Sequence, residues 1–180
     1  MRETTNDVVA DDAEKAAYLI FSLDGSDYAI CVDHVREIIT SIKTSPVPGS
    51  PDYLSGVSNL RGRILPMVDL RERFGMPSTV STDRDCYVIL MLEHRGGLVE
   101  VGVRVDAVKE VARIAGDEID PAPSIHDYAN KLVFRGVTKT ASGVKLVLDS
   151  AGLIQQLRED VRVQYLQACE SHLTNAIDRD

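Results

Sequence analysis

Short apolar runs alternate with turn-forming residues through most of the chain, and this pattern predicts a mostly β protein. Runs such as "YLIFSL", "YAICV", "CYVILML" and "GVKLVLD" are separated by segments rich in Gly, Pro, Asp and Ser. Strands this short, with turns at close intervals, are typical of small β-barrels. The segment "DGSD" between the first two runs indicates a β-hairpin, and "RGR" between "VSNL" and "RILPMV" indicates a second one.

The two halves of this β region resemble each other. "VDHVREI" begins at residue 32 and "VDAVKEV" at residue 105, an offset of 73 residues. Each half then has a proline-containing loop and ends on a strand that leads into an aspartate, Asp69 or Asp149, an offset of 80. The repeat predicts two related barrels in tandem, packed on each other, over about 18–80 and 84–153, with a strand that could be exchanged between them.

The two ends of the chain differ from this β region. Residues 1–16 are polar and acidic, which predicts a flexible lead-in. In the C-terminal part, 154–180, helical spacing places Leu157, Val161 and Tyr165 near one face, so an amphipathic helix and tail are expected. The apolar face could pack on the barrels, or it could bind another chain as a helix in a groove.

Three aspartates follow predicted strands, where they can cap short helical turns. Asp69 is expected to cap a helix over 70–74, with Glu72 at the third helical position completing a capping box. Asp33 and Asp106 are candidates to start one helical turn each. This pattern favours structural caps over catalytic acids.

The segment "NLRGRILPMVDL" combines a charged turn with an apolar strand. Gly62 can take positive φ without steric cost, so Arg61 and Gly62 are predicted to form a tight turn that places Arg61 at the rim of a barrel. Pro66 has no N–H and indicates an edge strand or a bulge. The turn could present Arg61 to a partner, or Arg61 could be an ordinary solvated residue.

Composition narrows the classes of function. The 180 residues are 44% hydrophobic and 27% charged, with a formal net charge of -8, which indicates a globular protein and disfavours nucleic acid as the main partner. The absence of a signal sequence and of an apolar run near 18 residues predicts a cytoplasmic protein without membrane insertion. Three cysteines, Cys31, Cys86 and Cys169, are expected to be free buried thiols.

No sequence motif indicates catalysis. Phosphate-binding glycine loops, zinc-ligand spacings and nucleophile motifs are all missing, so neither metal nor cofactor is expected. A small β-barrel enzyme stays the weaker alternative, because an acid/base pair depends on geometry that sequence does not give.

Three segments resemble the CheW family of bacterial chemotaxis coupling proteins. They are "YLIFSLDGSDYAICVDHVREI", "YLSGVSNLRGRILPMVDLRERFG" and "VGVRVDAVKEV", within a region from Tyr18 to Ile154. The resemblance implies two SH3-like five-stranded β-barrels packed side by side, with short helical turns and a C-terminal α-helix. It also implies a non-catalytic adaptor that couples the cytoplasmic tips of chemoreceptors to the regulatory domain of a CheA-type histidine kinase, in membrane-associated receptor arrays. A related pathway with another output, such as twitching motility, is the alternative.

The resemblance also implies roles for individual residues. A receptor-binding groove between the barrels is expected to include five residues: Val35, Glu37, Arg61, Val108 and Val111. A kinase-binding surface on the first barrel is expected around Val47, Tyr53 and Leu54. Because Arg61 and Glu37 both border the expected groove, we predict that they are neighbours in the folded protein.

Overall fold

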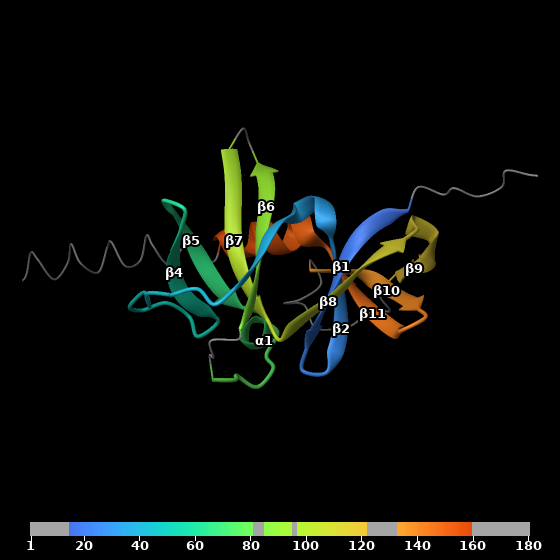
Figure 1. Ribbon diagram of the computed structural model, residues 1–180, viewed down its shortest axis with the longest axis horizontal. Coiled ribbons are helices and arrows are strands. Elements are labelled where there is room, and N and C mark those ends of the chain that lie inside the picture. The colour runs from blue at the N-terminus through green and yellow to red at the C-terminus, as the bar shows by residue number, and fades with distance from the viewer. Residues whose placement is uncertain (1–14, 81–84, 95–96, 122–132, 160–180) are drawn as a thin grey trace, which may run out of the picture.

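The computed structural model describes residues 15–80, 85–94, 97–121 and 133–159, and most of this part of the chain is β-strand (Figure 1). Helical structure in the described part is limited to the 3-10 turns η1 (Val32–His34) and η2 (Gly116–Glu118), the short helix α1 (Leu70–Arg73) and a C-terminal helix over 150–159. The prediction of a mostly β fold with short helical turns and a C-terminal helix is confirmed.

Eleven strands within the described ranges form two sheets. The six-stranded sheet has the order β8-β1-β2-β11-β10-β9, and the five-stranded sheet has the order β3-β6-β7-β5-β4. The strands of the six-stranded sheet are β1 (Ala16–Leu23), β2 (Ser26–Cys31), β8 (Ala107–Ile114), β9 (Ile119–Pro121), β10 (Phe134–Thr140) and β11 (Gly143–Leu148). Those of the five-stranded sheet are β3 (Val35–Thr40), β4 (Leu54–Leu60), β5 (Arg63–Asp69), β6 (Cys86–His94) and β7 (Gly97–Val105).

Each sheet contains strands from both halves of the chain. The β1–β2 hairpin pairs with strands of the second half, and the β6–β7 hairpin pairs with strands of the first. The barrels were expected to form from 18–80 and 84–153 separately. Instead, each half of the chain contributes one whole hairpin to the barrel of the other half. Each exchanged hairpin joins its new sheet through a parallel pairing, β2 with β11 and β7 with β5.

The two sheets repeat each other in register. Val147 of β11 pairs with Ala29 of β2, and Met67 of β5 pairs with Gly102 of β7. These pairs are related by the same offsets of 80 and 73 residues that relate the two halves of the sequence. The weak sequence repeat is thus a structural duplication in which corresponding residues occupy corresponding positions.

Both faces of the central strands are buried, which explains their unbroken apolar runs. In β1, Tyr18 and Ile20 pack within the six-stranded sheet's own barrel. The alternate residues Leu19 and Phe21 enter a larger cluster that also contains Val88 of the five-stranded sheet. We call this larger cluster the shared core. Because side chains alternate along a strand, one strand can supply both cores only if nearly every residue is apolar.

Each sheet curls back so that its outer strands approach each other. In the five-stranded sheet, Ser45 forms a bridge with Val57 of β4, and in the six-stranded sheet β9 pairs with β10. A Cβ atom on Gly56 would lie 2.1 Å from the carbonyl oxygen of Ser45, and one on Gly136 would lie 2.2 Å from that of Asp120. Glycine is therefore required where each barrel closes.

The C-terminal helix packs on its own protein over its described length. It begins at residue 150, where the Asp149 carboxylate accepts a hydrogen bond from the Gly152 backbone N–H at 3.1 Å. Leu153, Ile154 and Leu157 are fully buried in the shared core. The described part thus follows the intramolecular alternative, and the rest of the predicted helix, from residue 160, lies outside the described residues.

Asp69 caps α1 as predicted, although the capping box is incomplete. Its carboxylate accepts hydrogen bonds from the backbone N–H groups of Arg71 at 2.8 Å and Glu72 at 3.4 Å. The Asp69 N–H donates instead to the carbonyl of Tyr53 at 2.8 Å, because the chain enters the helix directly from paired strand β5. The predicted reciprocal bond from the Glu72 side chain is therefore replaced by a backbone contact.

Neither Asp33 nor Asp106 is a cap as predicted, although a helical turn does follow β2 as expected. Asp33 lies inside η1, whose N-cap is Cys31 and has no side-chain cap bond. Asp106 starts no helix, because the chain passes from β7 straight into β8. Its carboxylate instead accepts a hydrogen bond from the Asp24 backbone N–H at 2.8 Å. An aspartate directly after a strand can therefore precede either a helix or another strand, and the local sequence does not distinguish the two.

The cysteines agree with the expected free thiols where they are described. Cys31 is half-buried and Cys86 is buried, and both are free. Burial raises the pKa of the Cys86 thiol, which favours the unreactive protonated form. Cys169 lies outside the described residues.

Candidate interaction site

The outer strands β3 and β8 each carry a β-bulge at the same place. In β3, Val35 pairs with Leu90 and Glu37 with Ile89, so Arg36 is the extra residue. In β8, the corresponding pairs are Val108 with Phe21 and Glu110 with Ile20, so Lys109 is the extra residue. An extra residue reverses the faces of the residues that follow it. Val35 and Val108 therefore face the shared core, and the glutamates point to the opposite face.

Arg61 and Glu37 are neighbours, as predicted. Arg61 Nη2 lies 2.9 Å from Glu37 Oε2, with the arginine side chain 73% exposed and the glutamate side chain 20% exposed. Glu37 lies on β3 and Arg61 in the β4–β5 turn, which belong to opposite ends of the five-stranded sheet. The ion pair therefore bridges the two outer strands at the rim of the barrel.

The turn that presents Arg61 has the predicted geometry. Arg61 and Gly62 have φ values of 53° and 85°, and the Gly62 N–H donates to Asn59 Oδ1 at 2.8 Å. Two successive positive φ values fit a two-residue hairpin turn matched to the twist of its strands. The edge position predicted from Pro66 is wrong for the whole strand, since β5 lies between β7 and β4. Its pairing with β7 begins only at Met67, so Pro66 has a strand on one side only.

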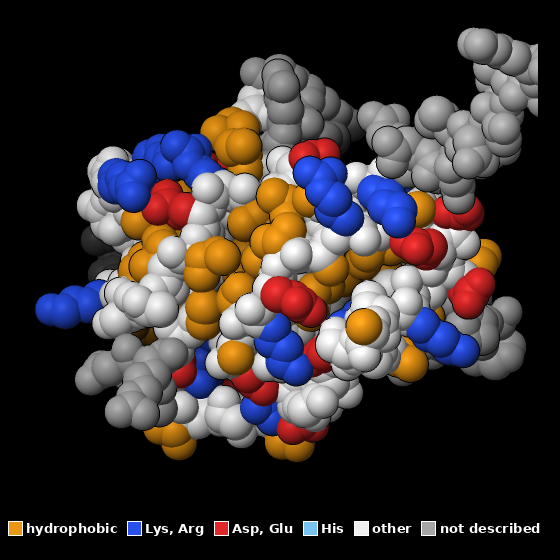
Figure 2. Space-filling view, turned by 45° about the vertical axis from the view of Figure 1, so that its right-hand side comes forward, with side chains coloured by type: hydrophobic (Ala, Val, Ile, Leu, Met, Phe, Trp, Pro, Cys, Tyr) orange, Lys and Arg blue, Asp and Glu red, His pale blue; other side chains and the backbone are white. Residues whose placement is uncertain are grey.

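Apolar side chains border the shared core on both outer strands. Val35 and Val108 are half-buried against the shared core. Val111 is 59% exposed and Ile38 is 43% exposed, and they occupy equivalent positions on β8 and β3. Sequence analysis missed Ile38, although the offset of 73 relates it to Val111. Figure 2 shows hydrophobic side chains gathered across the middle of one face, bordered by charged groups.

The predicted kinase-contact residues lie together but differ in exposure. Val47 and Tyr53 are half-buried, and the Arg73 guanidinium lies 5.4 Å from the centre of the Tyr53 ring. Leu54 is buried in the shared core, because it pairs with Val68 on the inward face of β4. Its side chain therefore supports this surface from beneath, in contrast to the surface contact that we expected.

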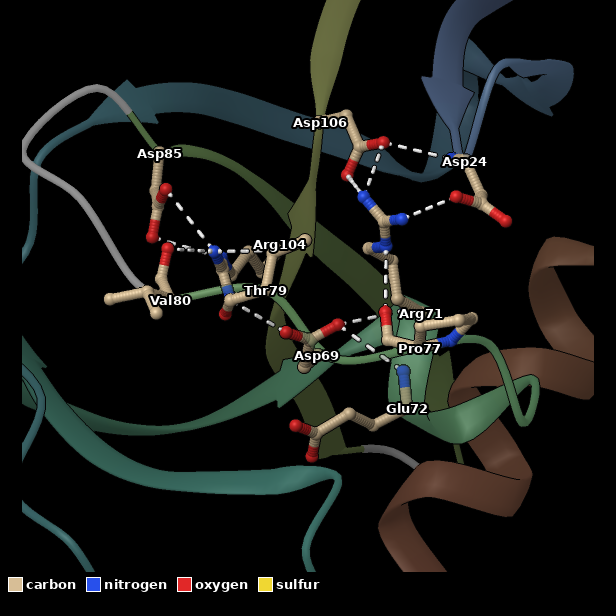
Figure 3. A network of polar contacts seen from close by, with 10 residues as sticks. All are labelled: Asp24, Asp69, Arg71, Glu72, Pro77, Thr79, Val80, Asp85, Arg104 and Asp106. Atoms are coloured by element: carbon tan, nitrogen blue, oxygen red, sulfur yellow. Dashed lines mark hydrogen bonds and ion pairs between the residues drawn. The ribbon is translucent and has the colours of Figure 1, made fainter.

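Sequence analysis also missed a buried polar network around Arg104 (Figure 3). Arg104 Nη1 lies 2.7 Å from Asp69 Oδ2, and its Nε lies 2.9 Å from Asp85 Oδ2. The same guanidinium donates to the carbonyls of Thr79 at 3.1 Å and Val80 at 3.2 Å. Burial disfavours the charge, but the two carboxylates outweigh that effect and raise the pKa of Arg104 above its ordinary value.

Arg71 extends this network to the other sheet (Figure 3). Its guanidinium lies 2.5 Å from Asp24 in the β1–β2 turn and 3.0 Å from Asp106 at the β7–β8 junction. Its Nε donates to the Pro77 carbonyl at 3.1 Å. Because α1 follows the five-stranded sheet and Asp24 belongs to the six-stranded one, Arg71 links the two barrels.

One acidic residue in each sheet binds two cations. Asp27 on β2 accepts from Lys109 at 2.5 Å and from Lys145 at 2.6 Å. Its equivalent on β7, Glu100, binds Arg36 and Arg63. In each case one cation is the bulge residue of the outer strand.

Low pH should reduce the folding stability of the protein, and the ion pairs of Asp27 should account for part of this loss. Hydrogen bonds from Lys109 and Lys145 lower the pKa of Asp27 below its usual value near 3.8. A lowered folded-state pKa adds stability at neutral pH, which is lost as the pH falls through that value. We therefore expect Asp27→Asn to reduce the free energy of unfolding most near pH 7 and progressively less below about pH 4.

Urea unfolding of the Asp27→Asn variant and of the parent protein across this pH range measures the effect. Asp117→Asn, a change at an exposed position in η2, is the control. A constant difference between Asp27→Asn and parent at every pH would contradict the linkage.

The described residues contain neither a candidate metal site nor a candidate membrane-spanning helix. They contain no group of three His, Cys, Asp or Glu side chains that could hold a metal ion. No helix within them has the length and apolarity needed to cross a membrane.

Two SH3-like β-barrels that share a core define the architecture of this chain. The CheW-like domain family matches residues 17–158, and the chain belongs to this family. The chain is 31% identical to the chemotaxis protein CheW of Thermotoga maritima over 149 residues, which is 83% of this chain and 94% of that protein.

Other relatives agree with this membership. The chemotaxis protein CheW of Bacillus subtilis is 36% identical over 105 residues, 58% of this chain and 65% of that protein. The match to the Klebsiella aerogenes protein of the same name covers 61% of its length, so this chain spans somewhat less than two thirds of either relative. The crystal structure of the scaffolding protein TtCheW from Thermoanaerobacter tengcongensis superposes with a TM-score of 0.66, at 27% identity, over 75% of this chain and 89% of that one.

Proposed function

We propose that this protein is a non-catalytic adaptor of bacterial chemotaxis, which couples chemoreceptor tips to a CheA-type histidine kinase. Support comes from membership of the CheW-like domain family and from relatives that are named chemotaxis proteins. A scaffolding role is also supported by the likeness to the solved TtCheW, which is described as a scaffolding protein. In this proposal the protein is cytoplasmic and is recruited to receptor arrays at the membrane.

The Arg61–Glu37 pair is the observation that best supports a partner site. An ion pair with one member 73% exposed contributes little to folding, about 0–1 kcal/mol. Its two side chains nevertheless lie fixed at a barrel rim, reached from opposite ends of a sheet. Charges arranged in this way contribute more to partner choice and orientation than to stability.

The proposed receptor site consists of this pair and of apolar side chains on the two outer strands β3 and β8. Val35, Val108 and Val111 supply the apolar contact area, which usually dominates binding energy, and Glu37 and Arg61 supply orientation. The proposed kinase site is the surface of Val47 and Tyr53, which rests on buried Leu54. Both sites need only complementary surfaces on the partners.

Reversing the charge of Arg61 tests the receptor site. We expect Arg61→Glu to keep the fold and to weaken binding of a receptor signalling-domain fragment at least about tenfold, roughly 1.4 kcal/mol, because two like charges then face the partner. Isothermal titration calorimetry measures the affinity, and thermal unfolding checks the fold. Lys139→Glu, at an exposed position in β10, is the matched charge-reversal control.

A charge swap separates two ways in which the pair could act. Arg61→Glu combined with Glu37→Arg restores attraction between the two positions but presents reversed charges to a partner. Recovery of binding would show that the pair acts by orienting the site, and continued loss would show direct contact. Wild-type affinity in the single variants, or failure of the parent to raise receptor-controlled kinase activity, would refute the proposal.

A further inference from the structure

The geometry points to Glu100 as a positioning residue for the Arg61–Glu37 pair, and we infer that it orients this site without touching the partner. This inference rests on the proposed receptor site. Glu100 lies on β7, inside the five-stranded sheet, and its side chain is only 6% exposed. Its two carboxylate oxygens bind Arg36 and Arg63, one each.

The first of these contacts fixes the bulge that orients Glu37. Arg36 is the extra residue of β3, between Val35 and Glu37. Without it, strand alternation would place Glu37 on the same face as Val35, toward the shared core. Arg36 also lies near Met91 Sδ, at 4.0 Å, on the neighbouring strand β6. By binding Arg36, Glu100 stabilises the conformation that places Glu37 at the barrel rim.

The second contact fixes the strand that follows Arg61. Arg63 is the first residue of β5, directly after the Arg61–Gly62 turn. Hydrogen-bonded pairing between β5 and β7 begins only at Met67, so backbone pairing to β7 does not hold this end of β5. The bond from Arg63 to Glu100 supplies a link to β7 at this end.

Glu100 thus connects the two segments that supply the ion pair. One oxygen holds the residue before Glu37, and the other holds the strand after Arg61. A carboxylate that accepts from two arginines is a strong acceptor, and its low exposure limits screening by water and salt. The Arg61–Glu37 bond itself is largely exposed, so it depends on this support for a fixed geometry.

The other barrel contains a similar carboxylate that binds two cations, and this provides a control. Asp27 occupies the position equivalent to Glu100 and binds Lys109, the bulge residue of β8, together with Lys145 on β11. Glu110, equivalent to Glu37, there accepts a hydrogen bond at 3.3 Å from Ser142, in the turn that corresponds to Arg61–Gly62. Removing the charge of Asp27 should disturb the second barrel and leave the Arg61–Glu37 pair in place.

The first measurement requires no partner. In the full chain, we expect Glu100→Gln to increase the mobility of the Arg61 guanidinium and of the Glu37 backbone, measured by 15N relaxation. Asp27→Asn should leave both unchanged. If Glu100→Gln does not fold, Arg36→Met and Arg63→Met remove one half of the arrangement each at more exposed positions and should each give the same increase. Unchanged mobility in these variants would overturn the inference.

The second measurement uses the receptor signalling-domain fragment. We expect Glu100→Gln to weaken binding about tenfold, and Asp117→Asn, at an exposed position in η2, to change it less than about twofold. If Arg61→Glu weakens binding but Glu100→Gln does not, the positioning role is wrong and the proposed site stands. If the fragment does not bind the parent protein, the proposed function is wrong, and the relaxation measurement still tests the role of Glu100.

Discussion

A chain that ends at Asp149 is expected to lose most of its folding stability, whereas a chain that ends at Glu159 should keep it. The shorter chain lacks Leu153, Ile154 and Leu157, which are fully buried in the shared core. Burial of each such side chain contributes about 1.5–3 kcal/mol. Their combined loss is comparable to the total stability of a typical domain, about 5–15 kcal/mol.

Urea unfolding followed by circular dichroism measures this difference. The chain that ends at Glu159 is the control, because it keeps every buried residue of the described helix. Equal unfolding midpoints for the two shortened chains would show that the helix is not part of the core. If only the chain that ends at Asp149 loses folding stability, the helix is part of the fold and does not serve only to bind another protein.

Replacement of Arg104 by methionine should destabilise the protein by about 3–5 kcal/mol, because it leaves the buried carboxylate of Asp69 without its ion-pair partner and removes a cation from Asp85. Methionine keeps much of the side-chain volume, so the lost charge and hydrogen bonds dominate the effect. Thermal or urea unfolding measures the change.

Two further variants identify the cause of that loss. Arg113→Met, at an exposed position on β8, should change the free energy of unfolding by less than about 0.5 kcal/mol. Adding Asp85→Asn to Arg104→Met should recover part of the stability by removing one of the two carboxylates that Arg104 binds in the parent protein. A change of less than 1 kcal/mol in Arg104→Met would mean that the network contributes little, as in exposed ion pairs.

Local features of the fold could be predicted where the determining interactions are local. The Arg61–Gly62 turn depends on glycine and on the flanking strands, and the Asp69 cap depends on the two residues after it. Both were correct. Asp106 shows the limit, because its local pattern matches that of a cap although the chain continues into a strand and its carboxylate binds Arg71 from a distant segment.

A strand exchange was anticipated from the repeat, but the exchange of a whole hairpin in each direction could not be predicted, for the same reason. Hydrophobic alternation identifies strands and hairpins but not the partner of each edge, and pairing within one half would also satisfy the repeat. In the candidate site, too, the residues that depend on pairing between distant strands were the ones not predicted. The resemblance supplied Arg61 and Glu37, but Ile38 and Glu100 depend on a bulge and on pairing between strands that the sequence does not show.

The exchanged hairpins also determine when the protein can fold during synthesis. The five-stranded sheet needs β3 and the hairpin that ends at Val105, and the six-stranded sheet needs β1 together with β11, which ends at Leu148. The β1–β2 hairpin therefore leaves the ribosome long before its partner strands exist. Contacts so distant in sequence are slow to form, whereas all strands of the five-stranded sheet lie within 35–105, so we expect the five-stranded sheet to form before the six-stranded one.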